Sequence, residues 1–146
     1  MKKQTKKQKA KYFNIVTTGK RKEAIAKATI KQGSGRITIN KKPITLLNNL
    51  QQLSLKEPFI LAQPLLGNDL NSVNIEVNVQ GGGVEGQLEA SRLAIARALL
   101  AYFKKPELKR AFLEYDRALL VADTRRKEQR KPNDSKARAA RQKSYR

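Results

Sequence analysis

The clearest hydrophobic pattern in the chain is a strict alternation over residues 73–80. Val73, Ile75, Val77 and Val79 are each separated by a single polar residue, and the polar positions hold Asn, Glu, Asn and Gln. A period of two places all four apolar side chains on one face of an extended chain. We therefore predict a strand over 73–80 with one buried and one wet face.

A second alternation lies nearer the N-terminus. Ala26, Ala28 and Ile30 alternate with polar residues, and the same pattern returns in residues 37–40 after the turn-forming sequence Gln-Gly-Ser-Gly at 32–35. Two alternating runs joined by a glycine-rich turn are typical of a hairpin. We predict that residues 26–31 and 37–40 pair as antiparallel strands.

Residues 85–103 have a helical period instead. Leu88, Ile95, Leu99 and Phe103 fall on one face, acids occupy the first turns, and two lysines follow the end, as the helix dipole favours. We expect this helix to pack on the core.

Two further helical regions are expected. The leucine-rich run that ends at Pro64 predicts one or two short helices, in which Ser54 and Glu57 are spaced as a capping box. Pro106 is suited to the first position of another helix, with an apolar face that includes Leu108, Phe112 and Tyr115. Together with the strands, these helices predict a small α+β sandwich.

Charge divides the chain into a domain and two basic ends. The formal net charge is +20; residues 1–22 hold nine Lys/Arg and no acid, and residues 125–146 hold ten Lys/Arg against two acids. Residues 23–124 hold 13 basic and 10 acidic residues, the balance of an ordinary domain. We therefore divide the chain into a disordered basic N-terminal extension (1–14), a globular α+β domain (15–124) and an extended basic C-terminal tail (125–146).

Composition excludes several chemistries. The chain has no Cys and no His, so disulfides, Cys or His metal sites, thiol catalysis and a Ser-His-Asp arrangement are impossible. The longest apolar run is Ala98–Phe103, which is too short for a signal peptide core or a membrane span. We expect no membrane partner, no small-molecule substrate and no catalytic residue, and we expect Asp116 and Asp123 to pair with Arg117, Arg125 or Arg126.

One motif favours an enzyme. Gly81, Gly83 and Gly86 match the dinucleotide-binding pattern G-x-G-x-x-G between a predicted strand and a predicted helix. That fingerprint also requires an acidic residue about 20 positions further on, where this chain has Phe-Lys-Lys-Pro at 103–106. It also leaves both basic ends unexplained, so we interpret these glycines as a turn that permits close backbone approach.

The two basic ends favour a nucleic-acid partner, because each phosphate they neutralise releases counterions. Tyr145 lies among the last charges of the tail, where its ring can stack on a base or a ribose. No helix-turn-helix, zinc finger or aromatic RNP motif is present, which favours insertion into folded RNA over reading of DNA sequence. A DNA-compacting protein or a free RNA chaperone remains the alternative.

Five stretches resemble the small-subunit ribosomal protein S-nine family in its archaeal and eukaryotic cytosolic branch. They are Thr18-Gly19-Lys20-Arg21-Lys22 followed by Ala24-Ile25-Ala26, the run from Gly81 to Gln87 leading into Ala94–Leu99, Tyr115-Asp116-Arg117, Ala122–Arg126, and the ending Arg141-Gln142-Lys143-Ser144-Tyr145-Arg146. The resemblance covers residues 16–146. Three features depart from the family pattern: Glu23 replaces Thr, the linker 134–140 is shorter and lacks glycine, and residues 1–14 are additional.

The resemblance implies a non-enzymatic, cofactor-free constituent of the small ribosomal subunit in the cytoplasm. Its expected fold is a two-layer sandwich of a mixed sheet with helices, like domain two of ribosomal protein S-five. Its expected partners are rRNA and other proteins of the subunit head, with the tail directed toward the peptidyl-site tRNA. By position, the residues expected to bind rRNA are Lys20, Arg21, Lys22, Arg125, Arg126, Lys127, Arg130, Lys131, Lys136, Arg138 and Arg141, and those nearest the tRNA are Lys143, Ser144, Tyr145 and Arg146.

Overall fold

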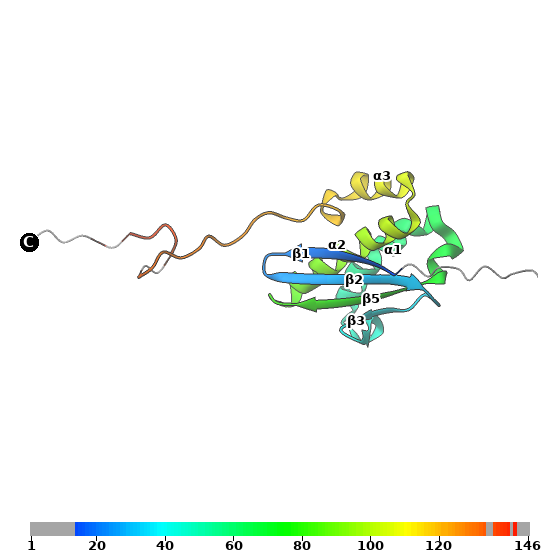
Figure 1. Cartoon of the computed structure of the whole chain (residues 1–146), viewed down its shortest axis with the longest axis horizontal. Helices are drawn as coiled ribbons and strands as arrows, with labels where there is room; N and C mark the ends of the chain where they lie inside the picture. Colours follow the sequence, from blue (N-terminus) through cyan, green and yellow to red (C-terminus); the bar gives the residue numbers. More distant parts are fainter. Residues whose placement is uncertain (1–13, 134–135, 141, 143–146) are drawn as a thin grey trace, which may run out of the picture.

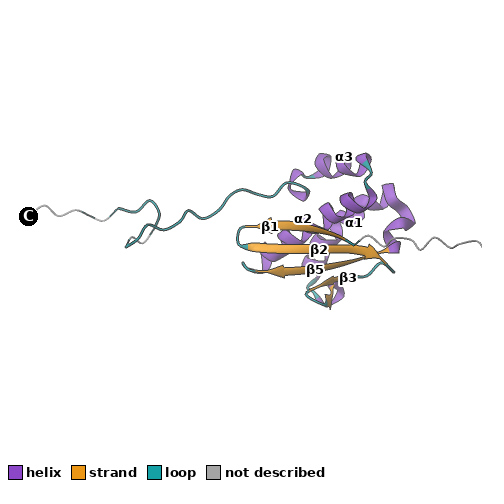
Figure 2. Cartoon of the chain, viewed as in Figure 1, coloured by secondary structure: helices purple, strands orange, loops and turns teal. Residues whose placement is uncertain are grey.

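A computed structural model describes residues 14–133, 136–140 and 142 of the chain. The described elements form one sheet and a helical layer on a single face of it (Figures 1 and 2). The strands are β1 (Ile15–Arg21), β2 (Ala24–Gln32), β3 (Ile37–Ile39), β4 (Lys42–Pro43) and β5 (Val73–Gln80). The α-helices are α1 (Asn49–Leu66), α2 (Val84–Phe103) and α3 (Pro106–Tyr115), with short 3-10 helices η1 (Ile44–Leu46), η2 (Gly67–Ser72) and η3 (Arg117–Leu119). The expected α+β sandwich is confirmed.

The sheet is mixed, with the strand order β1-β2-β5-β3-β4. β2 lies in the middle of an antiparallel trio, because it pairs with β1 along one edge and with β5 along the other. β3 runs parallel to β5 on the far side, and β4 pairs antiparallel with β3. The strand predicted over 73–80 has the same limits as β5, and its four apolar side chains are buried.

The predicted hairpin between residues 26–31 and 37–40 is wrong. Both runs form strands, but neither pairs with the other, because β1 and β5 already occupy both edges of β2. The turn after β2 instead crosses the end of β5: the Asn74 carboxamide oxygen accepts the N–H of Ser34 at 2.8 Å and of Arg36 at 2.9 Å. These two hydrogen bonds place the start of β3 beside the free edge of β5, with which β3 then pairs. β1 carries no strict alternation, and its sequence alone did not predict a strand.

Helix α2 packs on the sheet through small residues. β2 buries Ala24, Ala26 and Ala28 on its inner face, and α2 buries alanines of its own across the layer. At Gly19 of β1, an added Cβ would lie 2.0 Å from the carbonyl oxygen of Ala90, well inside any real contact. The absence of side-chain bulk therefore allows β1 and α2 to approach backbone to backbone.

The helices predicted at 85–103 and from Pro106 correspond to α2 and α3. The leucine-rich run forms a single helix of 18 residues, not short pieces. It begins after Asn48, whose N–H donates to the Gln51 side chain at 3.3 Å, and Ser54 donates to the carbonyl of Leu50 at 3.1 Å, so the expected Ser54–Glu57 capping box is absent. Pro58 lies inside the helix and is buried, so packing of this face offsets its missing hydrogen bond.

The glycine run between β5 and α2 has the structural role we inferred. Gly81 and Gly82 have φ of +76° and +65°, and a Cβ on Gly81 would lie 2.6 Å from the carbonyl oxygen of Glu23. A dinucleotide-binding unit needs a second parallel strand after its helix, whereas α2 is followed by α3 and η3, and the described chain has no strand beyond α2.

Candidate nucleic-acid interface at the root of the C-terminal tail

The segment that connects α3 to the C-terminal tail, Leu119–Arg125, is called the tail root below. The Asp116 side chain caps η3 by accepting the N–H of Ala118 at 2.8 Å. Arg97 of α2 then holds the next turn: its Nε and Nη2 donate to the carbonyl of Leu120 at 3.0 and 2.8 Å. Its Nη1 donates to the carbonyl of Thr18 at 2.8 Å. One guanidinium therefore joins α2, β1 and the start of the tail root.

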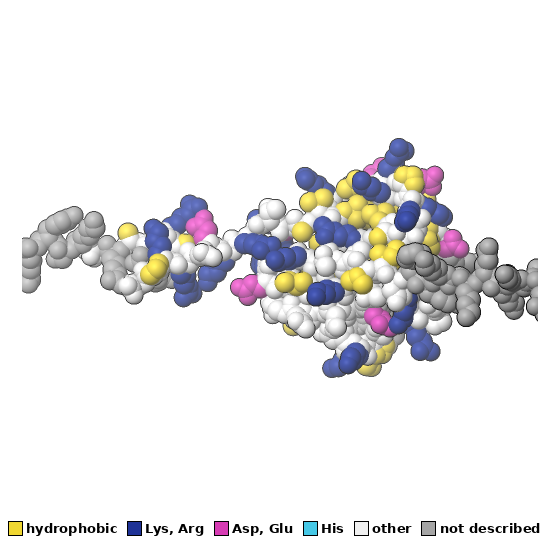
Figure 3. All heavy atoms as spheres, in the orientation of Figure 1, with side chains coloured by type: hydrophobic (Ala, Val, Ile, Leu, Met, Phe, Trp, Pro, Cys, Tyr) yellow, Lys and Arg dark blue, Asp and Glu magenta, His cyan; other side chains and the backbone are white. Residues whose placement is uncertain are grey.

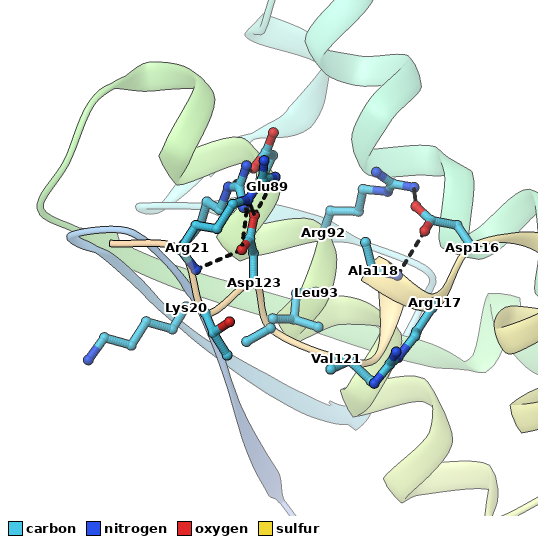
Figure 4. Close-up of a pocket in the computed structure, with 13 residues that line it drawn as sticks. Lys20, Arg21, Glu89, Arg92, Leu93, Asp116, Arg117, Ala118, Val121 and Asp123 are labelled. Atoms are coloured by element: carbon cyan, nitrogen blue, oxygen red, sulfur yellow. Dashed lines mark hydrogen bonds and ion pairs between the residues drawn. The ribbon is translucent and has the colours of Figure 1, made fainter. Parts of the chain in front are cut away.

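A second guanidinium joins the same elements three residues further along the tail root. Arg21, the last residue of β1, forms ion pairs with Glu89 of α2 through Nε and with Asp123 of the tail root through Nη1 (Figure 4). Asp123 also accepts from Arg125, whose backbone N–H donates at 2.8 Å and whose Nη2 donates at 2.7 Å. The Arg21 and Asp123 side chains are only 20% and 21% exposed, whereas that of Arg125 is 83% exposed.

An open hollow of about 550 Å³ lies against these ion pairs. Leu93 and Val121 point into it, and Arg117 lies on its far side (Figure 4). Its three acids are all paired with arginine, Asp116 with Arg92 at 3.0 Å and the other two with Arg21. The hollow therefore has little uncompensated negative charge toward a polyanion.

A larger groove of about 920 Å³ adjoins this hollow, and Arg21, Glu89 and Arg125 line both. It runs from the β1–β2 turn past the glycine loop to the start of the tail, and its cations Lys22, Arg126 and Lys127 have no carboxylate partner among the described residues. Three acids also line it, Glu23, Glu85 and Glu89, and the last of these is paired with Arg21. Because Gly83 faces open space, a phosphodiester backbone has room to approach the loop closely.

The described part of the tail runs away from the domain, and blue side chains gather along it and where it leaves the domain (Figures 1 and 3). Glu128 accepts from Arg138 at 2.9 Å, which draws two points of the tail together. This hydrogen bond holds the pKa of the Glu128 carboxyl below its ordinary value of 4.5, because it stabilises the charged form, and it raises the pKa of Arg138.

The cations expected to bind rRNA therefore fall into three groups. Arg21, Arg125 and Arg138 have carboxylate partners. Arg141, with the expected tRNA-proximal Lys143, Ser144, Tyr145 and Arg146, lies outside the described residues. The remaining cations are exposed and have no carboxylate partner in the described ranges: Lys20, Lys22, Arg126, Lys127, Arg130, Lys131 and Lys136.

Sequence reasoning missed the long-range partners of the two aspartates and the role of Arg97. Asp123 pairs with Arg125 as predicted, but it also pairs with Arg21, which is 102 residues away. Asp116 pairs with Arg92 of α2 and not with Arg117. Arg97 was not singled out at all. The available signal was its position between buried Ala96 and Ala98, where a charged side chain must find partners.

Two other kinds of feature bear on function, clusters of metal-ligating side chains and membrane-spanning helices. Within residues 14–133, 136–140 and 142, no group of three or more Asp and Glu is arranged to hold a metal ion. The same described part of the chain contains no helix long and apolar enough to span a bilayer.

A domain of modest charge that carries an extended cationic tail, with open hollows around the tail root, is typical of one class of protein: those that bind polyanions.

Comparison with known proteins identifies the family. A family model described as "Ribosomal protein S9/S16" matches residues 19–146. The chain is 48% identical over 135 residues to "Small ribosomal subunit protein uS9" of Methanococcus maripaludis strain C7, with 90% of this chain and 98% of the relative covered. It is 49% identical over 135 residues, with the same coverage, to the protein so named from Methanococcus vannielii. The chain belongs to the ribosomal protein S9/S16 family, a family of structural proteins of the ribosome, as its resemblance indicated.

Proposed function

We propose that this protein is a non-enzymatic structural constituent of the small ribosomal subunit in the cytoplasm, where it binds rRNA in the subunit head and directs its C-terminal tail toward the peptidyl-site tRNA. The observation that carries the proposal is the placement of charge. The tail holds ten Lys/Arg against two acids, whereas residues 23–124 hold 13 basic and 10 acidic residues.

Three groups of residues have separate roles in this proposal. The first group lies around the tail root and contacts rRNA phosphates there: Lys20, Arg21, Lys22, Arg125, Arg126 and Lys127, all of them exposed except Arg21. Arg130, Lys131, Lys136, Arg138 and Arg141 continue these contacts along the tail. Lys143, Ser144, Tyr145 and Arg146 are nearest the tRNA. Binding gains free energy mainly from released counterions, and the tail pins segments of RNA against the domain.

The test separates incorporation from tRNA contact. A chain truncated before Ser144 is expected to enter small subunits as well as the full chain does, and subunits that carry it are expected to retain less peptidyl-site tRNA. The matched control is Arg110→Gln, which also removes one positive charge but does so at an exposed position of α3, away from the tail. Equal tRNA retention by the truncated chain and by the control contradicts the proposed role of the last residues.

Incorporation is measured by sedimentation of the tagged full chain through a sucrose gradient, before and after a high-salt wash. Comigration with the small subunit that resists salt supports an integral component, since salt screens loosely held charges. Release to the top fractions at high salt favours instead a peripheral nucleic-acid binder such as a free RNA chaperone.

A further inference from the structure

The tail root is fastened to the domain at two successive points. Arg97 holds the carbonyl of Leu120 together with that of Thr18, and Arg21 holds Asp123 together with Glu89. Each guanidinium therefore bridges the tail root to β1 and α2, the two elements with the most extensive mutual packing in the domain. Two fixed points three residues apart define a direction as well as a position.

The contacts of Arg21 are those of an internal tie and not of a phosphate-binding side chain. Its Nε and Nη1 face different carboxylates, and its side chain is 20% exposed. A phosphate that approached Arg21 would also meet the charges of Glu89 and Asp123. Its neighbour Lys20 points away from this cluster, is exposed, and has no carboxylate partner among the described residues (Figure 4).

We propose that Arg21 is a positioning residue, which fixes the direction in which the C-terminal tail leaves the domain by bridging Asp123 and Glu89, and that it makes no direct contact with RNA. This inference rests on the proposed function, in which the tail is the part that reaches the distant RNA. It removes Arg21 from the group of phosphate-binding residues and gives Asp123, an acid in a basic region, a defined role.

The direction of the tail matters because of its length. The 23 residues after Asp123 span at most about 80 Å when extended, so a small rotation at the root displaces the tip by many ångströms. A root held at two points presents the tail along one direction before it meets RNA. Because the tail root is already ordered in the free protein, RNA binding does not have to offset the entropic cost of ordering it.

The experiment measures the direction of the tail in the free, full-length protein. The chain has no cysteine, so Asn78→Cys on the open sheet face and Gln129→Cys in the tail give a unique pair of spin labels. We expect a narrow distance distribution in this parent. Arg21→Gln and Asp123→Asn should each broaden it at least twofold, whereas Lys20→Gln, which removes the same charge one residue away, should leave it unchanged.

Two variants on opposite sides of the ion pair keep the result interpretable. Asp123 lies outside all described helices and strands, so Asp123→Asn decides the question if Arg21→Gln does not fold. Distributions in Arg21→Gln and Asp123→Asn that match the parent overturn the proposal. No RNA is present, so this failure is independent of the tRNA-retention test of the proposed function.

A second measurement distinguishes positioning from direct contact. Binding to transcribed small-subunit rRNA is followed over a range of salt concentrations. Each phosphate that the protein no longer neutralises lowers the slope of log K against log salt by about 0.7 to 0.9. We expect that decrease for Lys20→Gln and an unchanged slope for Arg21→Gln and Asp123→Asn. A decrease for Arg21→Gln without one for Asp123→Asn identifies Arg21 as a direct contact and overturns the proposal that it does not touch RNA.

Discussion

Replacing Gly19 with Ala tests the close approach of β1 and α2 on which the tail root depends. The new Cβ would lie 2.0 Å from the carbonyl oxygen of Ala90 and 2.7 Å from the backbone nitrogen of Ala94. Both neighbours are backbone atoms of a 20-residue helix, so no side chain can rotate away. Contacts of real Cβ atoms are essentially never shorter than 3.0 Å, so strand and helix must separate by about 1 Å.

The separation disturbs bonds as well as packing. Overpacking in a well-packed core costs about 1 to 3 kcal/mol. The hydrogen bonds from Thr17 to the Ala94 carbonyl (2.9 Å) and from Arg97 to the Thr18 carbonyl (2.8 Å) cross the same contact, and each contributes about 1 kcal/mol or more. We expect a total loss of about 3 kcal/mol in the free energy of unfolding. For a domain of this size, this loss lowers Tm by about 12 °C.

The assay is urea and thermal unfolding of the full chain, followed by circular dichroism, with Gly86→Ala as the matched control. Gly86 lies in α2, where an added Cβ would be at an ordinary 3.7 Å from that of Ala24. The same substitution there is free of strain and should stabilise the protein by about 0.4 to 1 kcal/mol. If Gly19→Ala unfolds within about 1 kcal/mol of the parent, the backbone contact between β1 and α2 is looser than argued.

Three further predictions concern separate parts of the chain. Arg97→Met leaves the carbonyls of Leu120 and Thr18 without their charged donor and should cost about 1.5 to 3 kcal/mol in urea unfolding; an unchanged midpoint contradicts its role as the first tie of the tail root. Deletion of residues 1–11, which carry six lysines, should weaken binding to small-subunit rRNA roughly uniformly and lower its salt slope by about 0.7 to 0.9 for each phosphate that is no longer neutralised; an equal slope shows that these lysines bind no phosphate. The hydrogen bond and the charge of Glu57 raise the pKa of the Tyr115 phenol above 10.0, which favours the neutral form in the folded state. Its stabilising effect is therefore present below pH 10 and is lost as the pH rises through the raised pKa; Glu57→Gln should move the phenol absorbance titration toward lower pH, and an unchanged titration contradicts the assignment.

The sequence predicted those elements whose pattern comes from burial of a single face. The alternation of residues 73–80 and the helical period of residues 85–103 define β5 and α2 almost to the residue. In both elements the side chains that face the core repeat with the period of the backbone itself. The charge imbalance of the tail was readable for a simpler reason, since charge is a property of composition and does not depend on the fold.

Strand pairing was decided by competition among strands. Residues 26–31 and 37–40 have the local pattern of a hairpin, but β2 has only two edges and both are occupied by other strands. Local sequence does not reveal that a third strand, β1, with Gly19 in place of an apolar residue, takes one of those edges. Likewise, α1 continues through Pro58 although proline lacks the N–H of an interior helical residue, and packing buries that side chain.

The sequence by itself determined the class of this protein: a small α+β domain with a strongly basic tail, and motifs sufficient to indicate its family. Only the tertiary structure decided which cations remain available to a polyanion. Arg21 and Lys20 are adjacent in the chain and carry the same charge, yet one is bound to two carboxylates and the other is exposed. The physical reason is that successive residues of a strand point to opposite faces of the sheet, and the partners of Arg21 come from α2 and from a segment 102 residues away.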